Sequence, residues 1–367
     1  MYLCSVPNTR LTRASLARRA DYTLPDPKHT RALVTPTARA DCVSHRIVPF
    51  APLVTADIPA FRDLRVTEQR NPRSVAIDLA SAREIVDIIV SEDAAVVPAL
   101  VSQRDALARA VSAAEFALRA GGRIVYAGAG TSGRLGVLDA SEIPPTFGAD
   151  FGLVVGLIAG GPAALLRAQE GAEDSADGGA RDLDAIAISA NDFVVGIAAS
   201  GTTPYVHGAL RHAKAIGATT GMIACTPLPD AIRDAIDIPI VIIVGPEVVT
   251  GSTRMKSGTA TKLALNIIST GAMIRIGKTF GNLMVDLRAT NAKLVDRSER
   301  IVAEVCSVPR DVARTLLQAA DGVVKRAIVM HLLQVDAEAA DAALSAAHGV
   351  IRRAVNSGPP PIAAGPR

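Results

Sequence analysis

The chain has 367 residues and a mass of 38.0 kDa; 49% of its residues are hydrophobic, 3% are aromatic and none is tryptophan. This length can bury one large domain or two moderate ones, and the scarcity of aromatic rings argues against a single-stranded nucleic-acid binder, which stacks bases on them. The net charge is +3, but residues 1–65 hold ten Lys and Arg against five Asp, so the basic balance belongs to this front segment and does not indicate a nucleic-acid partner.

Cysteine usage and hydropathy point to a reduced compartment. The four cysteines are far apart and form no C-x-x-C pair, which fits neither a disulfide framework nor a zinc site. No run of about 18 apolar residues is present, so we expect no membrane partner. The first 22 residues also lack the continuous apolar segment of a secretion signal. The sequence therefore predicts a cytoplasmic protein without a metal site.

The front of the chain divides into an irregular and a helical part. Residues 1–63 hold seven of the 22 prolines and show no sustained period, so we expect a poorly ordered, basic extension. Its Arg- and Ser-rich start is also compatible with a transit peptide, and we favour the flexible extension. Residues 64–120 are expected to form N-terminal helices. Ser81 can cap the first of them, and residues 95–122 predict one long amphipathic helix that ends at the Gly121-Gly122 pair.

Strands and helices then alternate. Continuous apolar strands separated by helices indicate a parallel sheet that is covered on both faces, so residues 115–280 predict an α/β domain, a three-layer αβα sandwich with a five-stranded parallel sheet. The helices between the strands include one predicted for residues 162–174. The five predicted strands are residues 123–128, 152–161, 193–200, 220–226 and 238–245.

The last third of the chain is expected to be helical. After Gly258 the pattern turns wholly helical, first over residues 259–277. A C-terminal helical region of three or four shorter helices is predicted for residues 281–355, and Asp336 followed by Glu338 is typical of the start of one of them. Residues 356–367 have the composition of a flexible tail.

A glycine-rich loop follows the first predicted strand. "VYAGAGTSGRLG", residues 125–136, contains G-x-G-x-x-G, and such a strand-to-helix turn points backbone N–H groups and a helix dipole at an anion. A dinucleotide site also needs a carboxylate about 20 residues on, at the end of the next strand, and that strand ends in "LIAGG". The hydroxyls of Thr131 and Ser132 favour a phosphate monoester instead. The alternative is a tight turn with no ligand.

A second loop carries the same chemistry. Residues 200–204, "SGTTP", again place hydroxyls and glycine after a strand and before a helix, and ligands of open α/β sheets bind outside such strand ends. Two hydroxyl-rich loops on neighbouring strands can hold one phosphate from both sides. The alternative is a pair of unrelated Ser and Thr turns that cap their helices.

These words and their neighbours resemble a known family. "AGTSGR" with "SGTTPY" resembles the sugar isomerase (SIS) fold of phosphosugar-binding proteins, and the blocks "GAGTSGRLGVLDASEIPPTFG", "EGAEDS", "GIAASGTTPYV" and "GPEVVTGSTRMKSGTATKLALNIISTGAMI" resemble the N-acetylmuramic acid 6-phosphate etherases over roughly residues 64–355. The last block is shared in outline with the glucokinase regulatory protein, a non-catalytic relative. The resemblance implies a lyase without a cofactor that acts on a phosphosugar in cell-wall recycling.

The resemblance also implies an acid–base pair. Glu142 in "LDASE" matches the residue that protonates the departing D-lactate, and Glu173 in "EGAED" matches the base that removes the C2 proton. Such an elimination needs one carboxyl protonated and the other ionised at the same pH. From spacing alone, a solvated surface glutamate is the simpler reading of either residue, and Glu170, Asp139 and Asp174 are equally good carboxylates.

The phosphate-binding set follows from the two loops. It comprises Gly130, Thr131, Ser132, Gly133, Arg134, Ser200, Gly201, Thr202 and Thr203. Arg254 and Lys256 are further candidates to neutralise the phosphate or the lactyl carboxylate, and structural charge at helix ends is the alternative for them and for Arg134. Thr202 stands where many of these etherases have arginine, which leaves affinity and exact substrate open.

Three other functions compete with the etherase. A phosphosugar-sensing regulator of the glucokinase-regulatory-protein type would have two SIS domains where this chain has room for one. An aldose–ketose isomerase would lack the "LDASE" and "EGAED" words, and a sugar-responsive transcription factor would need a helix-turn-helix that the proline-rich front does not provide. As a partner, the resemblance implies a second copy of the chain: a homodimer with shared active sites, residues 258–278 lying near the other subunit.

Overall fold

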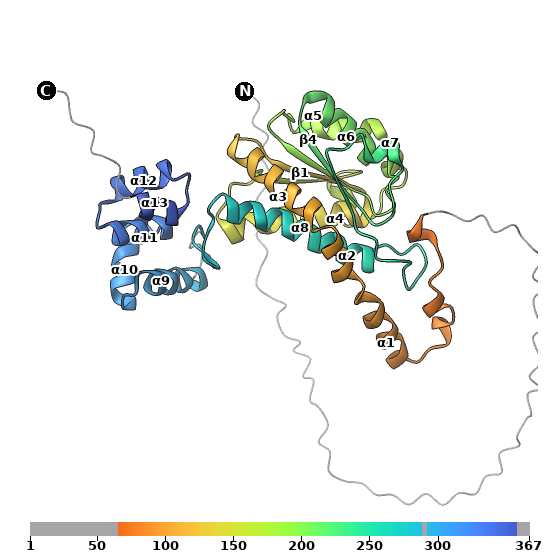
Figure 1. Ribbon diagram of the computed structural model, residues 1–367, viewed down its shortest axis with the longest axis horizontal. Coiled ribbons are helices and arrows are strands. Elements are labelled where there is room, and N and C mark those ends of the chain that lie inside the picture. Colours follow the sequence, from red (N-terminus) through yellow and green to blue (C-terminus); the bar gives the residue numbers. More distant parts are fainter. Residues whose placement is uncertain (1–64, 288–291, 358–367) are drawn as a thin grey trace, which may run out of the picture. The chain divides into compact units, whose positions relative to one another are not determined.

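The computed structural model describes residues 65–287 and 292–357, so the predictions for residues 1–63 and for most of the tail lie outside the described residues. The chain separates into two units, Met1–Pro59 and Ala60–Arg367, and the described residues belong to the second. Figure 1 shows its helices around a central sheet, followed by the C-terminal helices. The first elements are η1 (Val66–Glu68), η2 (Pro72–Ser74), η3 (Ile77–Leu79), α1 (Ala82–Asp93), α2 (Val96–Ser102) and α3 (Arg104–Arg119).

The start of α1 is as predicted, whereas the long helix after it is broken. Ser81 and Glu84 form a reciprocal capping box at the N-terminus of α1. The single helix predicted for residues 95–122 is wrong, because α2 and α3 are separated at Gln103 (φ −104°, ψ 11°). The Gln103 side-chain oxygen accepts a hydrogen bond from the backbone N–H of Val241 at 3.0 Å. The break between the helices therefore lies at the residue whose side chain binds the last residue of an edge strand.

The central sheet has five parallel strands in the order β2-β1-β3-β4-β5. All five predicted strands are confirmed; β1 ends at Gly128 as predicted, and the other four end somewhat earlier than their apolar runs. Their bounds are β1 (Ile124–Gly128), β2 (Val154–Ile158), β3 (Phe193–Ile197), β4 (Thr219–Ala224) and β5 (Ile238–Val241). The predicted αβα sandwich is therefore the observed architecture.

Alternate residues of each strand face opposite layers, as the period of two demands. Ile124 and Tyr126 of β1 belong to a core shared with α2, α3, α4 (Gly130–Phe147) and α8 (Lys256–Arg275). Val125 and Ala127 belong to the opposite core, shared with α5 (Ala176–Ala185) and α6 (Pro204–Ile216). Figure 1 shows the orange, yellow and teal helices on one side of the sheet and the green helices on the other.

The helix predicted for residues 162–174 is wrong. Two short 3₁₀ turns stand there instead, η4 (Pro162–Leu165) and η5 (Ala172–Asp174), joined by an irregular loop. Gly160, Gly161 and Gly171 all have positive φ, of 86°, 70° and 73°, a conformation that interrupts a helix and that glycine adopts without cost. Glu173 therefore lies on a 3₁₀ turn.

The C-terminal region contains one feature that the helical pattern did not predict. The segment after α8 forms an antiparallel hairpin of β6 (Thr279–Phe280) and β7 (Leu283–Met284), so the chain does not turn wholly helical. Five helices follow rather than three or four, and α12 starts at Asp336 as predicted, with the Asp336 carboxylate accepting from the Ala339 N–H at 2.9 Å. They are α9 (Ala292–Cys306), α10 (Arg310–Ala319), α11 (Val324–Leu333), α12 (Ala337–Ala346) and α13 (Ile351–Ser357).

The described residues contain neither a membrane-spanning helix nor a cluster of metal ligands. None of the described helices has the length and the apolar character to cross a membrane. Nor do residues 65–287 and 292–357 bring together three or more His, Cys, Asp or Glu side chains in a way that could hold a metal ion.

Candidate functional site

The two phosphate loops lie next to each other at the carboxyl edge of the sheet. The first follows β1 and the second follows β3, and these strands are hydrogen-bonded neighbours. In the order β2-β1-β3-β4-β5 the chain turns to opposite sides of β1, so the gap between β1 and β3 is the topological switch point of the sheet. Ligands of doubly wound sheets bind in the crevice at this point. The sequence therefore predicted correctly that both loops meet at one edge.

The first loop is a tight turn directly into α4. Gly130 (φ +52°) is the first residue of α4, and no side chain caps this N-terminus. A Cβ on Gly133 would lie 2.7 Å from the Gly128 carbonyl oxygen and 2.7 Å from Ile158 Cγ1, so the chain packs too closely here for any larger residue. Because the backbone N–H groups of the first turn have no partner within a helix, they are available to an anion. Thr131 and Ser132 belong to this first turn and are partly exposed.

The second loop is held by its own hydroxyls and by a histidine. Ser200 Oγ lies 3.1 Å from Thr202 Oγ1, and the Thr202 N–H donates weakly to Ser200 Oγ at 3.4 Å. Gly201 takes the left-handed conformation (φ +70°), and its carbonyl accepts a hydrogen bond from His207 Nε2 at 2.9 Å. Thr203 is the residue before α6 and makes no side-chain cap. His207 thus acts as a structural support of the loop.

A cavity of about 320 Å³ opens beside the first loop. Gly130 and Arg134 line it from α4, and Glu170 and Glu173 line it from the opposite segment. The structure therefore brings the predicted base to the predicted phosphate loop. Both carboxylates are exposed, and Glu173 makes no hydrogen bond or ion pair with another described residue. Cavity position alone does not distinguish Glu173 from Glu170.

Arg134 is engaged in a different way from the one predicted. Its Nη2 donates to the Ala164 carbonyl at 2.7 Å and its Nε donates to the Leu165 carbonyl at 3.0 Å. These carbonyls belong to η4, in the same segment that carries Glu173 further on. Charge-assisted hydrogen bonds of this length are strong, so the guanidinium ties the Glu173 segment to the phosphate-loop helix.

Glu142 lines another cavity. This second cavity, of about 430 Å³, lies between α4 and α8, and Asp139, Lys262 and Asn266 line it together with Glu142. Glu142 follows Gly130 by twelve residues on α4, which at 1.5 Å per residue is about 18 Å along the helix axis. Within one chain, the two predicted catalytic carboxylates are thus not brought together. Glu142 is exposed and has no hydrogen-bond or ion-pair partner among the residues that the structure describes.

Asp139 differs from Glu142 in being anchored. Its carboxylate accepts hydrogen bonds from Tyr126 Oη at 3.0 Å and from Ser269 Oγ at 3.2 Å. Burial raises the pKa of Asp139, while these two hydroxyls and the charge of Lys262 act in the opposite direction. Asp139 is therefore a structural carboxylate that joins the sheet to α8.

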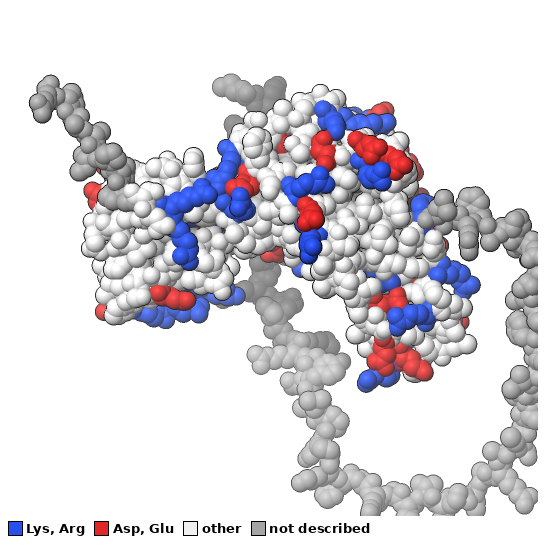
Figure 2. Space-filling view, viewed as in Figure 1, with Lys and Arg blue, Asp and Glu red and all other residues white. Residues whose placement is uncertain are grey.

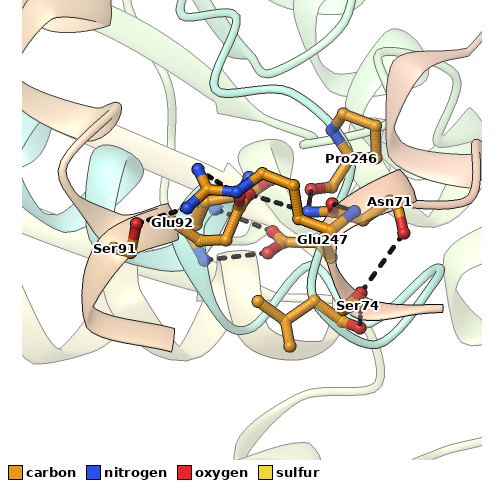
Figure 3. A network of polar contacts seen from close by, with 10 residues as sticks. Asn71, Ser74, Ser91, Glu92, Pro246 and Glu247 are labelled. Carbon is orange, nitrogen blue, oxygen red and sulfur yellow. Dashed lines mark hydrogen bonds and ion pairs between the residues drawn. The ribbon is translucent and has the colours of Figure 1, made fainter. Parts of the chain in front are cut away.

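Lys256 is buried in an ion pair. Its Nζ lies 2.6 Å from Glu92 Oε2, and the two side chains are 2% and 8% exposed. Asn71 donates to the same carboxylate oxygen at 2.7 Å and to the Pro246 carbonyl at 3.1 Å. Figure 3 shows this network between the N-terminal helices and the loop before α8. The Lys256 ammonium thus has a partner, whereas Arg254 is exposed and lacks one among the described residues.

The two carboxylates of this network have different roles: Glu92 is held ionised, and Glu247 caps α8. Burial acts to raise the pKa of Glu92, but hydrogen bonds from Lys256 and Asn71 and the nearby charges outweigh it, so the pKa lies below its ordinary value. Glu247 accepts from the backbone N–H groups of Lys256 at 3.0 Å and of Ser257 at 2.9 Å. A carboxylate at a helix N-terminus is favourable because it meets free N–H groups and the dipole.

Positive and negative side chains are mixed on the face of the described residues that Figure 2 shows. Figure 2 has the view of Figure 1, and over the part of this face where α5, α6 and α7 (Asp230–Arg233) lie, blue Lys and Arg side chains lie among red Asp and Glu side chains. Examples are the pairs of Lys214 with Asp237 at 2.7 Å and of Arg233 with Asp230 at 2.8 Å. Oppositely charged side chains therefore pair with each other on this part of the surface.

Sequence reasoning missed Lys262 and Asn266, which line the cavity of Glu142. The available signal was their spacing: residues 262, 266 and 269 follow the period that places side chains on one face of a helix. A helix within a predicted sandwich does not reveal which neighbouring helix that face meets.

Comparisons with known proteins identify the family of the chain. A model of the glucokinase regulatory protein N-terminal SIS domain matches residues 106–214. Proteins named N-acetylmuramic acid 6-phosphate etherase from Salmonella agona (strain SL483), Salmonella typhi and Salmonella schwarzengrund (strain CVM19633) are each 55% identical over 271 residues, which is 74% of this chain and 91% of each relative. With a SIS fold, two hydroxyl-bearing loops at its switch point and this degree of identity, the chain belongs to the N-acetylmuramic acid 6-phosphate etherase family.

Proposed function

We propose that the protein cleaves the D-lactyl ether of N-acetylmuramic acid 6-phosphate and releases N-acetylglucosamine 6-phosphate and D-lactate. The reaction would serve the recycling of cell-wall amino sugars in the cytoplasm. The observation that carries the proposal is the cavity beside the first phosphate loop, where the first turn of α4 and the Glu173 segment meet in a chain whose relatives carry this name.

The chemistry requires two proton transfers. In the open-chain sugar the C2–H bond is acidic because C1 is an aldehyde. The Glu173 carboxylate takes this proton, the C2–C3 double bond forms as the C3–O bond breaks, and the Glu142 carboxylic acid protonates the departing ether oxygen. Water then adds its oxygen to C3 while C2 regains a proton, which restores both residues. Positioned proton transfer of this kind contributes on the order of 10²- to 10⁴-fold per group.

The phosphate is proposed to bind between the two loops. The free N–H groups of α4 and the hydroxyls of Thr131 and Ser132 would hold it from one side, and Ser200, Thr202 and Thr203 from the other. We assign Arg134 to the support of the Glu173 segment, because its Nε and Nη2 donate to two carbonyls that precede Glu173 in this segment. Arg254 remains available to the ligand, and Lys256 does not enter the proposed site.

The separation of Glu142 from the phosphate loop supports a homodimer with shared active sites. About 18 Å along α4 is farther than one hexose phosphate reaches from its phosphate to C3. A second copy would bring its α4–α8 cavity to the sugar. We place this contact on exposed aliphatic side chains of α1, α2 and α8, because exposed apolar surface marks interaction sites where it is contiguous. They are Val86, Val90, Val97, Val101, Ile267 and Ile274.

The reaction is tested with purified protein and N-acetylmuramic acid 6-phosphate in D₂O. Lactate release with deuterium at C2 of the product, read by mass spectrometry, is expected for elimination through C2. Glu173→Ala should abolish both signals, whereas Asp174→Asn, a change of the adjacent carboxylate outside the cavity, should keep them. Loss of both signals in Glu170→Ala instead would reassign the base. Phosphosugar binding without any lactate would leave a regulator as the better account.

The shared site is tested by mixing two inactive variants. Glu142→Ala and Glu173→Ala are unfolded together and refolded at equal concentrations. If each site takes Glu173 from one chain and Glu142 from its partner, half of the dimers are mixed and each holds one intact site, so about a quarter of wild-type activity returns. If both residues serve the same chain's substrate, no activity returns.

A further inference from the structure

A chain of hydrogen bonds ends at the wall of the cavity that Glu142 lines. It starts at Tyr126 of β1, whose hydroxyl donates to Asp139 at 3.0 Å. The Asn266 amide nitrogen donates to Asp139 Oδ1 at 3.0 Å, and its oxygen accepts from Lys262 Nζ at 2.8 Å, in the amide orientation that satisfies both neighbours. This chain of hydrogen bonds therefore connects the interior of the sheet with the Lys262 ammonium group on α8.

Lys262 is the cation at the end of this chain of hydrogen bonds. Its side chain is exposed and lines the cavity, and among the described residues its ammonium contacts an amide oxygen rather than a carboxylate. An ammonium has three donors, and the Asn266 oxygen occupies one of them. The remaining donors are available to an anion in the cavity.

Glu142 lines the same cavity from the facing helix. The rest of the wall mixes apolar side chains with hydroxyl groups, as expected for the recognition of a small organic acid. These further lining residues include Leu135, Leu138, Ile143, Leu265 and Thr270.

The chemistry of the proposed leaving group fits this pair of side chains. In a lactyl ether, the ether oxygen and the carboxylate are attached to the same carbon atom. A group that protonates the ether oxygen must therefore have the carboxylate beside it. A cation within the same cavity as the acid is where such a carboxylate would be recognised.

We propose that Lys262, held by Asn266 and Asp139, binds the carboxylate of the lactyl group and so selects ethers that carry an acid. The inference rests on the proposed function and assigns a specificity-determining residue to it. Phosphate recognition belongs to the loops at the sheet edge, so different elements bind the substrate's two anionic groups: the two loops before α4 and α6 bind the phosphate, and α8 binds the carboxylate.

The test compares two substrates that differ only in this charge. One is N-acetylmuramic acid 6-phosphate, and the other is its lactamide analogue, in which a neutral carboxamide replaces the carboxylate. The wild-type protein should prefer the acid in kcat/KM by about 10- to 100-fold, the range of one charge-assisted hydrogen bond. Lys262→Met should lose this preference through a fall on the acid alone, with the rate on the amide unchanged within about threefold.

Two further variants separate selection from general damage. Asn266→Ala should leave an intermediate preference, because Lys262 keeps its charge and loses the group that positions it. Lys214→Met, which removes a lysine paired with Asp237 on the opposite side of the sheet, should keep the full preference. Equal losses on both substrates in Lys262→Met, or no loss on either, would overturn the proposal.

Binding keeps this test independent of turnover. The affinities of the acid and the amide are also measured by calorimetry in a Glu173→Ala background, where substrate is not consumed. A charge preference that disappears with Lys262→Met supports the carboxylate site even if the wild-type protein releases no lactate, and that second result would count against the proposed reaction alone. Binding of acid and amide with equal affinity refutes the carboxylate site.

Discussion

Replacing Glu92 by Gln is expected to destabilise the protein more than replacing its partner Lys256 by Met, although both changes break the same ion pair. The side chain of Lys256 is 2% exposed, and its Nζ has the Glu92 carboxylate at 2.6 Å. After Glu92→Gln the ammonium is buried beside a neutral amide. After Lys256→Met the carboxylate still has Asn71 at 2.7 Å and Arg73 at 3.0 Å.

The two magnitudes follow from this difference in remaining partners. An uncompensated buried charge costs about 3–5 kcal/mol, a large share of the roughly 5–15 kcal/mol by which native proteins are stable. A carboxylate that loses one of three partners loses on the order of 1–2 kcal/mol. The double variant Glu92→Gln with Lys256→Met removes the stranded charge and should be more stable than Glu92→Gln alone.

Urea denaturation at pH 7 and one fixed protein concentration measures these free energies of unfolding. Asp87→Asn is the matched control, because its pair with Arg83 is exposed on both sides and should matter by less than about 1 kcal/mol. The pKa of Glu92 is lowered in the folded protein, so its stabilisation is present above the unfolded pKa and is lost as the pH falls through the folded one. A Glu92→Gln free energy within about 1 kcal/mol of wild type, with an unchanged slope, would refute the reasoning.

Three further predictions concern the site and the sheet. Gly133→Ala forces a Cβ to within 2.7 Å of the Gly128 carbonyl oxygen and of Ile158. We therefore expect the free energy of unfolding, measured in urea, to fall by about 1–3 kcal/mol, and phosphosugar binding, measured by calorimetry, to weaken. Unchanged phosphosugar affinity would contradict the loop geometry. Arg134→Gln should lower kcat/KM by about 10-fold or more with a shift in Tm of only a few degrees, because it frees the Glu173 segment. If Arg134→Lys is no more active than Arg134→Gln, both hydrogen-bond donors of the arginine are needed. Full activity of Arg134→Gln would reject the role of Arg134 as a support of the Glu173 segment. Asp192, whose pKa lies below its ordinary value because hydrogen bonds and the charge of Arg123 outweigh burial, should stabilise the protein above its unfolded pKa and lose this effect toward lower pH, so the stability of Asp192→Asn and of wild type should converge in acid.

The sheet and both phosphate loops were predictable because their signals are local. Each strand is a short apolar run that ends at glycine or hydroxyl residues, and parallel strands with helices between them leave few alternatives for topology. The neighbouring position of β1 and β3 then brings the loops at Gly130 and Ser200 together. Capping residues such as Ser81 and Asp336 were also predictable, since a side chain bonded to a backbone three residues away is a local event.

The errors arose where a distant contact decides the local structure. The break at Gln103 depends on a hydrogen bond to Val241, 138 residues further along the chain, and nothing near Gln103 announces it. The loop that carries Glu173 is irregular because several glycines take positive φ, a choice that composition alone does not impose. The partner of Lys256 is Glu92, 164 residues away, so the sequence could not tell a ligand cation from a buried ion pair.

The capping of α8 by Glu247 has a consequence for how the protein sorts anions. Three helices, α4, α6 and α8, start near the carboxyl ends of the strands, and each N-terminus attracts negative charge. At α8 the protein's own carboxylate already occupies the first N–H groups, and at α6 the first residue is Pro204, which has no N–H to offer. Only α4 begins without a capping side chain or a proline among these three. A phosphate that approaches this edge therefore meets one helix N-terminus that is free to bind it, that of α4, rather than three. The Glu247 carboxylate occupies the N-terminus of α8, so α8 does not compete with α4 for the phosphate.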